Sequence, residues 1–224
     1  MQKLVFFLLF CWVHGLYAQP YAYITNQGDN SVSVIDTNTN TVIQTIAVGH
    51  RPAGVVVSSN GKRVYISNPE SKNISVIDTK TLTNIKTIKI GSGPLAIAIS
   101  PNDQSVYVAD WYEDSIFIVD TTSLSIRNKI KVGNSPSGLV VSPDGQFLYV
   151  ANRDENTVMI INLSENKIVD TIEVGIAPFG LAFNASVFLR ILSIIGLSES
   201  TITLSTTTEL FGSGKSSIGG IISV

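Results

Sequence analysis

The protein has 224 residues, of which 14% are charged, and its formal net charge at pH 7 is −2. A nucleic-acid partner would require a basic face, so this composition argues against nucleic-acid binding. Cys11 is the only cysteine, which excludes an internal disulfide and a zinc site built on several cysteines. Abundant Ser, Thr, Asn, Val and Ile favour strands and turns over helices.

Residues 1–18 have the pattern of a secretory signal peptide. Lys3 supplies a positive charge, residues 4–13 are almost continuously apolar, and Ala18 is a small residue suited to cleavage. About ten apolar residues are roughly half of what a membrane-spanning helix needs. We therefore expect a secreted, periplasmic or cell-surface protein with no stable membrane span after cleavage; a signal anchor is the alternative.

Residues 19–184 contain four copies of a unit that repeats every 42 residues. The tyrosines that mark the copies are Tyr23, Tyr65, Tyr107 and Tyr149. Each unit has four stretches rich in β-branched and aromatic residues, and tight-turn pairs such as Asn60-Gly61 and Asp144-Gly145 separate the first stretch from the second. Four strands in about 40 to 45 residues are typical of a propeller blade. The sequence predicts an all-β fold, a β-propeller with four clear four-stranded blades.

The two ends of the repeat region raise the question of ring closure. The first unit begins at the second strand of a blade, so we expect its innermost strand to come from elsewhere in the chain. Residues 185–224 retain only fragments of the pattern. They are either a degenerate fifth blade that closes the ring or a truncated remnant of a larger propeller, in which 179–183 would be the last strand.

Three short motifs recur at a fixed spacing over residues 21–184. These are Tyr-Val/Ile-x-Asn, as at 149–152, Val-Ile-Asp-Thr, as at 34–37, and Val-Gly-x-x-Pro, as at 48–52. Together they resemble the YVTN family of β-propeller repeats. The resemblance implies a prokaryotic secreted or cell-surface protein from a family that usually closes with about seven blades.

Residues that recur in every unit are expected to serve the fold. Asp36, Asp78 and Asp120 are each followed by Thr and should cap the turn between the third and fourth strands through hydrogen bonds to backbone N–H groups. An active site is normally single, so we do not interpret these repeated carboxylates as catalytic.

Few residues could carry catalysis or hold a metal ion. His50 is the only histidine after residue 18, and the sequence has no Gly-x-Ser-x-Gly motif and no phosphate-binding loop. We therefore expect no catalytic residues, no metal and no cofactor, and a protein that is not an enzyme.

A binding site is expected where the repeats diverge. Trp111 and Tyr112 occupy a loop position that holds polar or charged residues in the other units. His50, Arg51 and Arg153 should lie on the same face, and aromatic and arginine side chains often anchor binding interfaces. These five residues predict a non-enzymatic binding or scaffold propeller for a protein or glycan partner. The alternative is a propeller enzyme or electron-transfer accessory, either lactonase-like or associated with haem or quinone.

Overall fold

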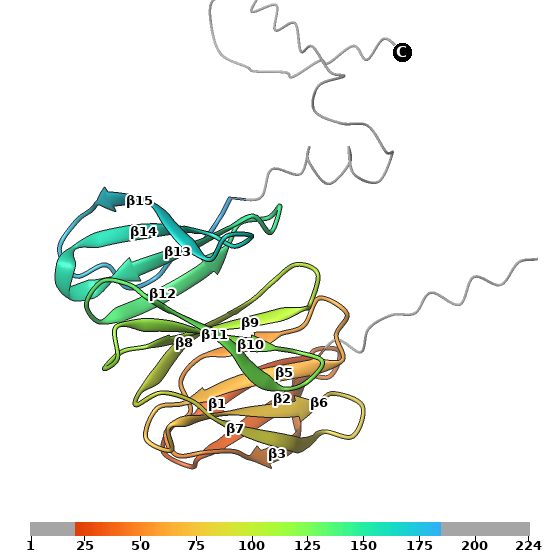
Figure 1. Ribbon diagram of the computed structural model, residues 1–224. Coiled ribbons are helices and arrows are strands. Elements are labelled where there is room, and N and C mark those ends of the chain that lie inside the picture. Colours follow the sequence, from red (N-terminus) through yellow and green to blue (C-terminus); the bar gives the residue numbers. More distant parts are fainter. Residues whose placement is uncertain (1–20, 185–224) are drawn as a thin grey trace, which may run out of the picture. The chain divides into compact units, whose positions relative to one another are not determined.

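The computed structural model describes residues 21–184, which form antiparallel β-sheets placed one after another along the chain (Figure 1). The predicted signal peptide at 1–18 and the predicted fifth blade or remnant at 185–224 lie outside the described residues. The first sheet has three strands: β1 (Tyr21–Asn26), β2 (Ser31–Asp36) and β3 (Thr41–Ala47). The other three have four strands each: β4 (Val55–Val57), β5 (Arg63–Asn68), β6 (Asn73–Asp78) and β7 (Thr83–Lys89); β8 (Pro94–Ile99), β9 (Ser105–Asp110), β10 (Ser115–Asp120) and β11 (Ser125–Lys131); β12 (Pro136–Val141), β13 (Phe147–Asn152), β14 (Thr157–Asn162) and β15 (Lys167–Glu173).

These sheets confirm the prediction of an all-β propeller with four-stranded blades, and we call them blades 1 to 4. Blade 1 lacks an innermost strand within the described residues, as the offset of the repeat predicts. Helix is limited there to one 3-10 turn, η1 (Arg153–Glu155). None of the described helical structure is long and apolar enough to cross a membrane.

The turns form as the sequence predicts. Gly61, Asp103 and Gly145 have φ values of 68°, 58° and 74°, which lets the tight hairpins between the first two strands of blades 2 to 4 close. At the opposite hairpin, Asp78 Oδ1 accepts a hydrogen bond of 2.8 Å from the Thr81 backbone N–H. Asp120 Oδ1 accepts the same bond, at 2.7 Å, from Ser123. The repeated aspartates are therefore turn caps.

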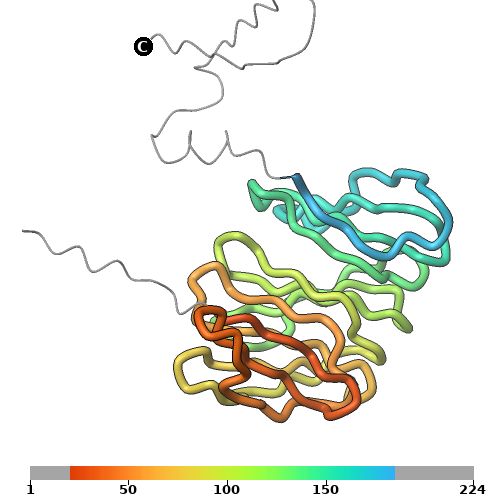
Figure 2. The backbone as a smooth tube through the Cα atoms, turned by 180° about the vertical axis from the view of Figure 1, so that it is seen from behind, coloured from red at the N-terminus to blue at the C-terminus, as the bar shows by residue number. Residues whose placement is uncertain are grey.

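The core lies between successive sheets, which follow one another in chain order (Figure 2). In blades 2 to 4 the second strand has the most buried residues: β9 is buried at all six positions, whereas the outer strand β15 is exposed at all seven. Val and Ile side chains from neighbouring sheets form three apolar clusters. Burial of this β-branched surface holds the blades together.

The inner strands lie close enough that glycine is required at two positions. A Cβ atom on Gly54 would lie 2.7 Å from the Leu95 carbonyl oxygen, and one on Gly138 would lie 2.1 Å from that of Phe179. Ser67 Oγ also donates to Leu95 O at 2.6 Å, so hydrogen bonds as well as packing join neighbouring blades. Residues 179–183, which one interpretation of the sequence predicted as a strand, form none.

Candidate functional site

Two kinds of loop meet at one end of the strands. One joins the second strand of a blade to the third, and the other joins the outer strand of a blade to the inner strand of the next, or to the residues that follow β15. The first kind comprises residues 27–30, 69–72, 111–114 and 153–156, and the second comprises 48–54, 90–93, 132–135 and 174–177. We call this end of the molecule the loop face, and it contains all five residues that the sequence predicts as a binding site.

A repeated hydrogen bond connects the two kinds of loop. Asn30 Oδ1 accepts from the Arg51 backbone N–H at 2.9 Å, and Asp114 Oδ1 accepts from that of Ser135 at 3.0 Å. Asn30 and Asp114 have φ values of 53° and 46°, a conformation that Asn and Asp tolerate well. This bond fixes the backbone that presents Arg51.

Blade 3 replaces that bond with a buried carboxylate. In blade 2, Lys72 occupies the position of Asn30, and its side chain has no acceptor atom. The backbone N–H of Gly93, which is equivalent to that of Arg51, instead donates to Asp110 Oδ2 at 2.8 Å. The same carboxylate accepts backbone hydrogen bonds from Ser92 at 2.7 Å, Tyr112 at 3.1 Å and Glu113 at 2.9 Å. Asp110 is fully buried and thus fixes both loops beside Tyr112.

Trp111, Tyr112 and Arg153 form a group that we call the aromatic cluster. Trp111 is half-buried, and the Arg153 guanidinium of the next blade lies 5.8 Å from the centre of its ring, a cation–π distance. Tyr112 is 74% exposed and lies against Gly93, where a Cβ atom would come within 2.4 Å of its Cδ2. The Tyr112 ring is therefore largely exposed to solvent and packs against the backbone of Gly93.

The acidic side chains around the aromatic cluster are paired. Glu113 forms an ion pair of 2.6 Å with Lys129, and the hydrogen bonds from Lys129 and Ser92 lower the pKa of its carboxyl. The backbone N–H of Ser135 lowers the pKa of Asp114, which also pairs with Lys131 at 3.1 Å. Both carboxylates are thus ionised at neutral pH and are weak proton acceptors.

His50 and Arg51 lie elsewhere on the loop face, beside blades 1 and 2. They line a pocket of about 480 Å³ with Glu70, and we call it the histidine pocket; its remaining lining residues are Gln27, Gly28 and Asn30. Arg51 Nη1 lies 3.3 Å from Glu70 Oε1. The His50 backbone N–H donates to Ser71 Oγ at 2.5 Å, which anchors the loop that carries the imidazole. An imidazole, a guanidinium and a carboxylate thus share one pocket.

The structure therefore divides the five predicted residues between two places. Trp111, Tyr112 and Arg153 form the aromatic cluster, whereas His50 and Arg51 belong to the histidine pocket. Sequence reasoning missed Glu70 and Asp110. The repeat could have indicated Asp110, because the other three units have asparagine at the same position: Asn26, Asn68 and Asn152. Nothing in the repeat pattern distinguished Glu70. Residues 21–184 contain no group of three or more His, Cys, Asp and Glu side chains that could hold a metal ion.

Comparison with known proteins identifies the family to which the chain belongs. The chain matches the family described as "Lactonase, 7-bladed beta-propeller" over residues 14–123, 78–168 and 116–184. These overlapping matches extend over most of the chain. The protein belongs to this lactonase family of seven-bladed β-propellers.

Solved structures and one curated sequence add further similarities. The structure of hydrazine synthase from Kuenenia stuttgartiensis is similar with a TM-score of 0.66 and 29% identity, over 67% of this chain and 45% of that one. A functionally unknown protein from Desulfotomaculum acetoxidans has the same TM-score at 17% identity, over 72% and 55%, and shows the fold alone. The PE-PGRS family protein PE_PGRS18 of Mycobacterium tuberculosis is 53% identical over 47 residues, which are 20% of this chain and 10% of that protein. This chain thus spans about half or less of these proteins.

The family match corrects one expectation from the sequence. We expected a protein that is not an enzyme, because repeated residues looked structural and His50 was the only histidine in the repeats. The lactonase family and the similarity to hydrazine synthase instead place the chain among enzyme-related propellers. The expectation rested on the scarcity of histidine and on the repetition of the carboxylates, whereas residues on different loops, such as His50 and Glu70, come together only in the fold.

Proposed function

We propose that the protein is a lactonase-class propeller that opens cyclic esters at the histidine pocket. The family match over residues 14–184 is the observation that carries the proposal. The pocket supports it, because His50, Arg51 and Glu70 are the groups that ester hydrolysis uses: a base, a cation for the developing oxyanion, and a carboxylate that orients the cation.

The proposed reaction needs only water as the second substrate. His50 accepts a proton from a water molecule while the water oxygen bonds to the lactone carbonyl carbon. The guanidinium of Arg51 stabilises the negative charge that forms on the carbonyl oxygen. The ring carbon–oxygen bond then breaks, the alkoxide takes the proton back from His50, and a hydroxy acid leaves.

Hydrolysis of γ- and δ-lactones by the full chain tests this proposal, with acid release followed in a weakly buffered solution. We expect His50→Gln to lower kcat by about 100-fold or more, since a general base contributes roughly 10² to 10⁴. Arg51→Gln should lower kcat with little change in KM. The matched control is Arg153→Gln, a loop-face arginine outside the pocket. Equal turnover by the His50 variant and the wild type would overturn the assignment.

We propose as a second function that the aromatic cluster contacts a protein or glycan partner. The 74% exposure of Tyr112 beside the Trp111–Arg153 pair supports it, because exposed aromatic and arginine side chains are the usual anchors of interfaces. Pull-down from an extracellular fraction and a glycan array would supply the ligand. Tyr112→Ala should then weaken binding by about 2 kcal/mol. Val42→Ala, which changes an exposed apolar residue on the outer strand β3, is the control.

We also propose that the repeats are of the YVTN type and that the protein is exported to the periplasm, the cell surface or the medium. The motifs over residues 21–184 and the apolar segment at 4–13 support this. Mass spectrometry of the exported protein should find a chain that starts at Gln19 or Leu16. An intact Met1 on soluble cytoplasmic protein would contradict it.

A further inference from the structure

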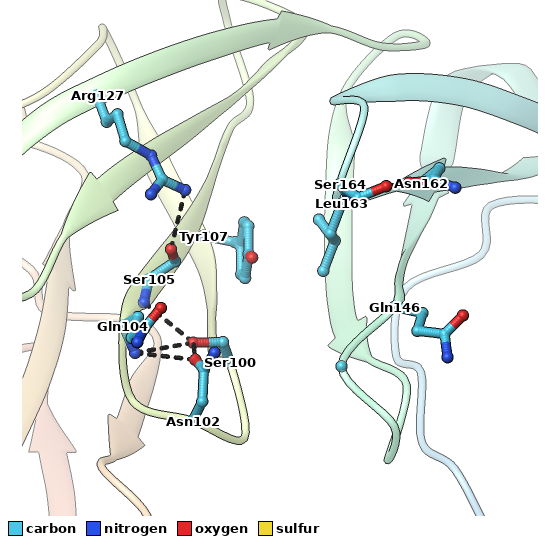
Figure 3. Close-up of a pocket in the computed structure, with 11 residues that line it drawn as sticks. Ser100, Asn102, Gln104, Ser105, Tyr107, Arg127, Gln146, Asn162, Leu163 and Ser164 are labelled. Atoms are coloured by element: carbon cyan, nitrogen blue, oxygen red, sulfur yellow. Dashed lines mark hydrogen bonds between the residues drawn. The ribbon is translucent and has the colours of Figure 1, made fainter.

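The end of the strands opposite the loop face has a pocket between blades 3 and 4. Its volume is about 380 Å³, within the usual range for small-ligand sites. The residues that line it are Ser100, Asn102, Gln104, Ser105, Tyr107, Arg127, Gly145, Gln146, Asn162, Leu163 and Ser164. Figure 3 shows residues of blade 3 on one side and residues of blade 4 on the other.

Comparison with the preceding pair of blades explains why the pocket is open. Between blades 2 and 3, Arg63 Nη1 donates to the carbonyl oxygen of Thr121. The Asp103 carboxylate accepts hydrogen bonds from the backbone of Ser59 at 2.6 Å and Asn60 at 2.9 Å. Both side chains bridge the two blades and fasten them at this end.

Both bridges are missing between blades 3 and 4. A shift of 42 residues places Ser105 at the Arg63 position and Gly145 at the Asp103 position, and both residues line the pocket. A serine cannot reach across the interface and a glycine has no side chain to accept a hydrogen bond. The absence of both bridges therefore distinguishes this interface from that of blades 2 and 3.

The pocket has a cation, Arg127, that does not bridge the two blades, unlike Arg63 at the preceding interface. Arg127 lies on the outer strand β11, where blade 2 has Ile85, and its Nη2 donates to Ser105 Oγ at 3.1 Å (Figure 3). No Asp or Glu is among the lining residues. One guanidinium therefore faces a pocket otherwise lined by neutral groups, which favours an anion.

The remaining groups suit a ligand with several hydroxyls. Tyr107 is buried at the pocket, and burial raises the pKa of its hydroxyl, which stays protonated and can donate. Gln104 and Gln146 contribute amide groups from the two blades, and Ser164 contributes a hydroxyl. Amides and hydroxyls both donate and accept, as recognition of a sugar ring requires.

We propose that this pocket binds a sugar acid, with its carboxylate on Arg127 and its hydroxyls on the amide and hydroxyl groups of blades 3 and 4. The site is separate from the histidine pocket, since it lies at the other end of the strands, and it does not depend on the lactonase function. A free uronic acid and the end of an acidic polysaccharide share this chemistry.

Isothermal titration of the full chain with galacturonate tests the site. We expect galacturonate to bind at least 10-fold more tightly than galactose, which lacks the carboxylate, and than acetate, which lacks the hydroxyls. Equal affinity for all three ligands would overturn the proposal, and so would the absence of galacturonate binding at concentrations of about 10 mM. Tighter binding of tetragalacturonate assigns the site to a polysaccharide end, and equal or weaker binding assigns it to the free sugar acid.

Three variants locate the binding. Arg127→Gln should weaken galacturonate binding by about 10-fold or more and leave galactose binding unchanged. The double variant Ser105→Arg with Gly145→Asp places two larger side chains where small residues now line the pocket and should abolish binding. The matched control, Arg63→Ser with Asp103→Gly, opens the interface of blades 2 and 3, where Ile85 supplies no charge, and should not change binding. Unaltered binding in the first two variants would show that the pocket is not the site.

Discussion

At the scale of single residues, Asp110 is the side chain on which the loop face depends most. It is fully buried, and its two oxygens accept four backbone hydrogen bonds, from Ser92, Gly93, Tyr112 and Glu113. A carboxylate can satisfy all four donors because both of its oxygens accept, whereas an amide has one oxygen.

We therefore predict that Asp110→Asn lowers the free energy of unfolding by about 3 kcal/mol, because two buried N–H groups lose their acceptor. Urea denaturation followed by circular dichroism measures the change. Asp154→Asn is the control, an exposed loop carboxylate of the next blade whose replacement should have little effect. A stability close to that of the wild type for Asp110→Asn would show that water replaces the lost bonds.

The turn aspartates predict a loss of stability in acid. Backbone hydrogen bonds from Thr81 and Ser123 lower the pKa values of Asp78 and Asp120. A carboxyl pKa that is lower in the folded state contributes stability at neutral pH, which is lost as the pH falls from the unfolded value of about 4. Thermal unfolding at pH 7 and pH 3 measures this loss.

Blade 4 supplies a matched variant for that prediction. Asn162 occupies the same turn position, and its Oδ1 accepts a hydrogen bond of 2.9 Å from the Ser164 backbone. Asp78→Asn with Asp120→Asn should therefore keep the turns and reduce the difference between the two pH values. An unchanged difference would assign the acid sensitivity to other carboxylates, such as the ion-paired Glu113.

At the scale of elements, the hairpin turn of one blade is fastened to the next by Asp103. Its two oxygens accept from the backbone of Ser59 and Asn60 across the interface between blades 2 and 3. Asp103→Asn keeps a residue suited to its φ of 58° but leaves a single acceptor. We predict a loss of about 1 kcal/mol in the free energy of unfolding.

The reverse change provides the comparison. Gly145→Asp places a carboxylate at the same position beside the turn of blade 3, where Pro101 has no N–H and only the Asn102 backbone can donate. It should therefore raise the unfolding temperature by less than Asp103→Asn lowers it. If neither variant changes stability, these interblade bonds are replaced by water in solution, and packing alone holds the blades in register.

At the scale of the whole described part, the four blades differ in how well they are covered. Strands β5, β6, β9 and β10 lie between neighbouring sheets and are largely buried. In the terminal blades the corresponding strands are less buried: β1 has no fully buried residue, and β14 has two. Stability in a repeat protein depends on the interfaces between neighbours, so it should be lowest where an interface is missing.

Hydrogen exchange of the full chain tests this gradient. Backbone amides of β5, β6, β9 and β10 should exchange slowest, and those of blade 1 and blade 4 faster. Equal protection of blade 1 would show that its missing inner side is covered in solution, as ring closure requires. Deletion of residues 185–224 would then remove that protection only if this segment supplies the cover.

The sequence alone determined the repeat, the strands and the turns. These depend on local chemistry: the spacing of tyrosines, the alternation of β-branched residues, and turn residues that accept a positive φ. The repeat also predicted which loops share one face, because strand direction alternates within a blade. The capping role of Asp78 and Asp120 could be predicted for the same reason, since donor and acceptor are only three residues apart.

Only the tertiary structure decided which side chains meet. His50 shares a pocket with Glu70, and the Arg153 guanidinium lies over the Trp111 ring. Asp110 accepts the Gly93 backbone hydrogen bond for which Lys72 of the preceding blade has no acceptor. Each of these contacts joins residues about 20 to 40 positions apart, across a loop or an interface whose geometry no local pattern encodes. The pocket at Ser105 and Gly145 shows the same principle. It lies where two small residues replace the side chains that bridge blades 2 and 3. That this replacement leaves an open pocket depends on how blade 4 packs on blade 3.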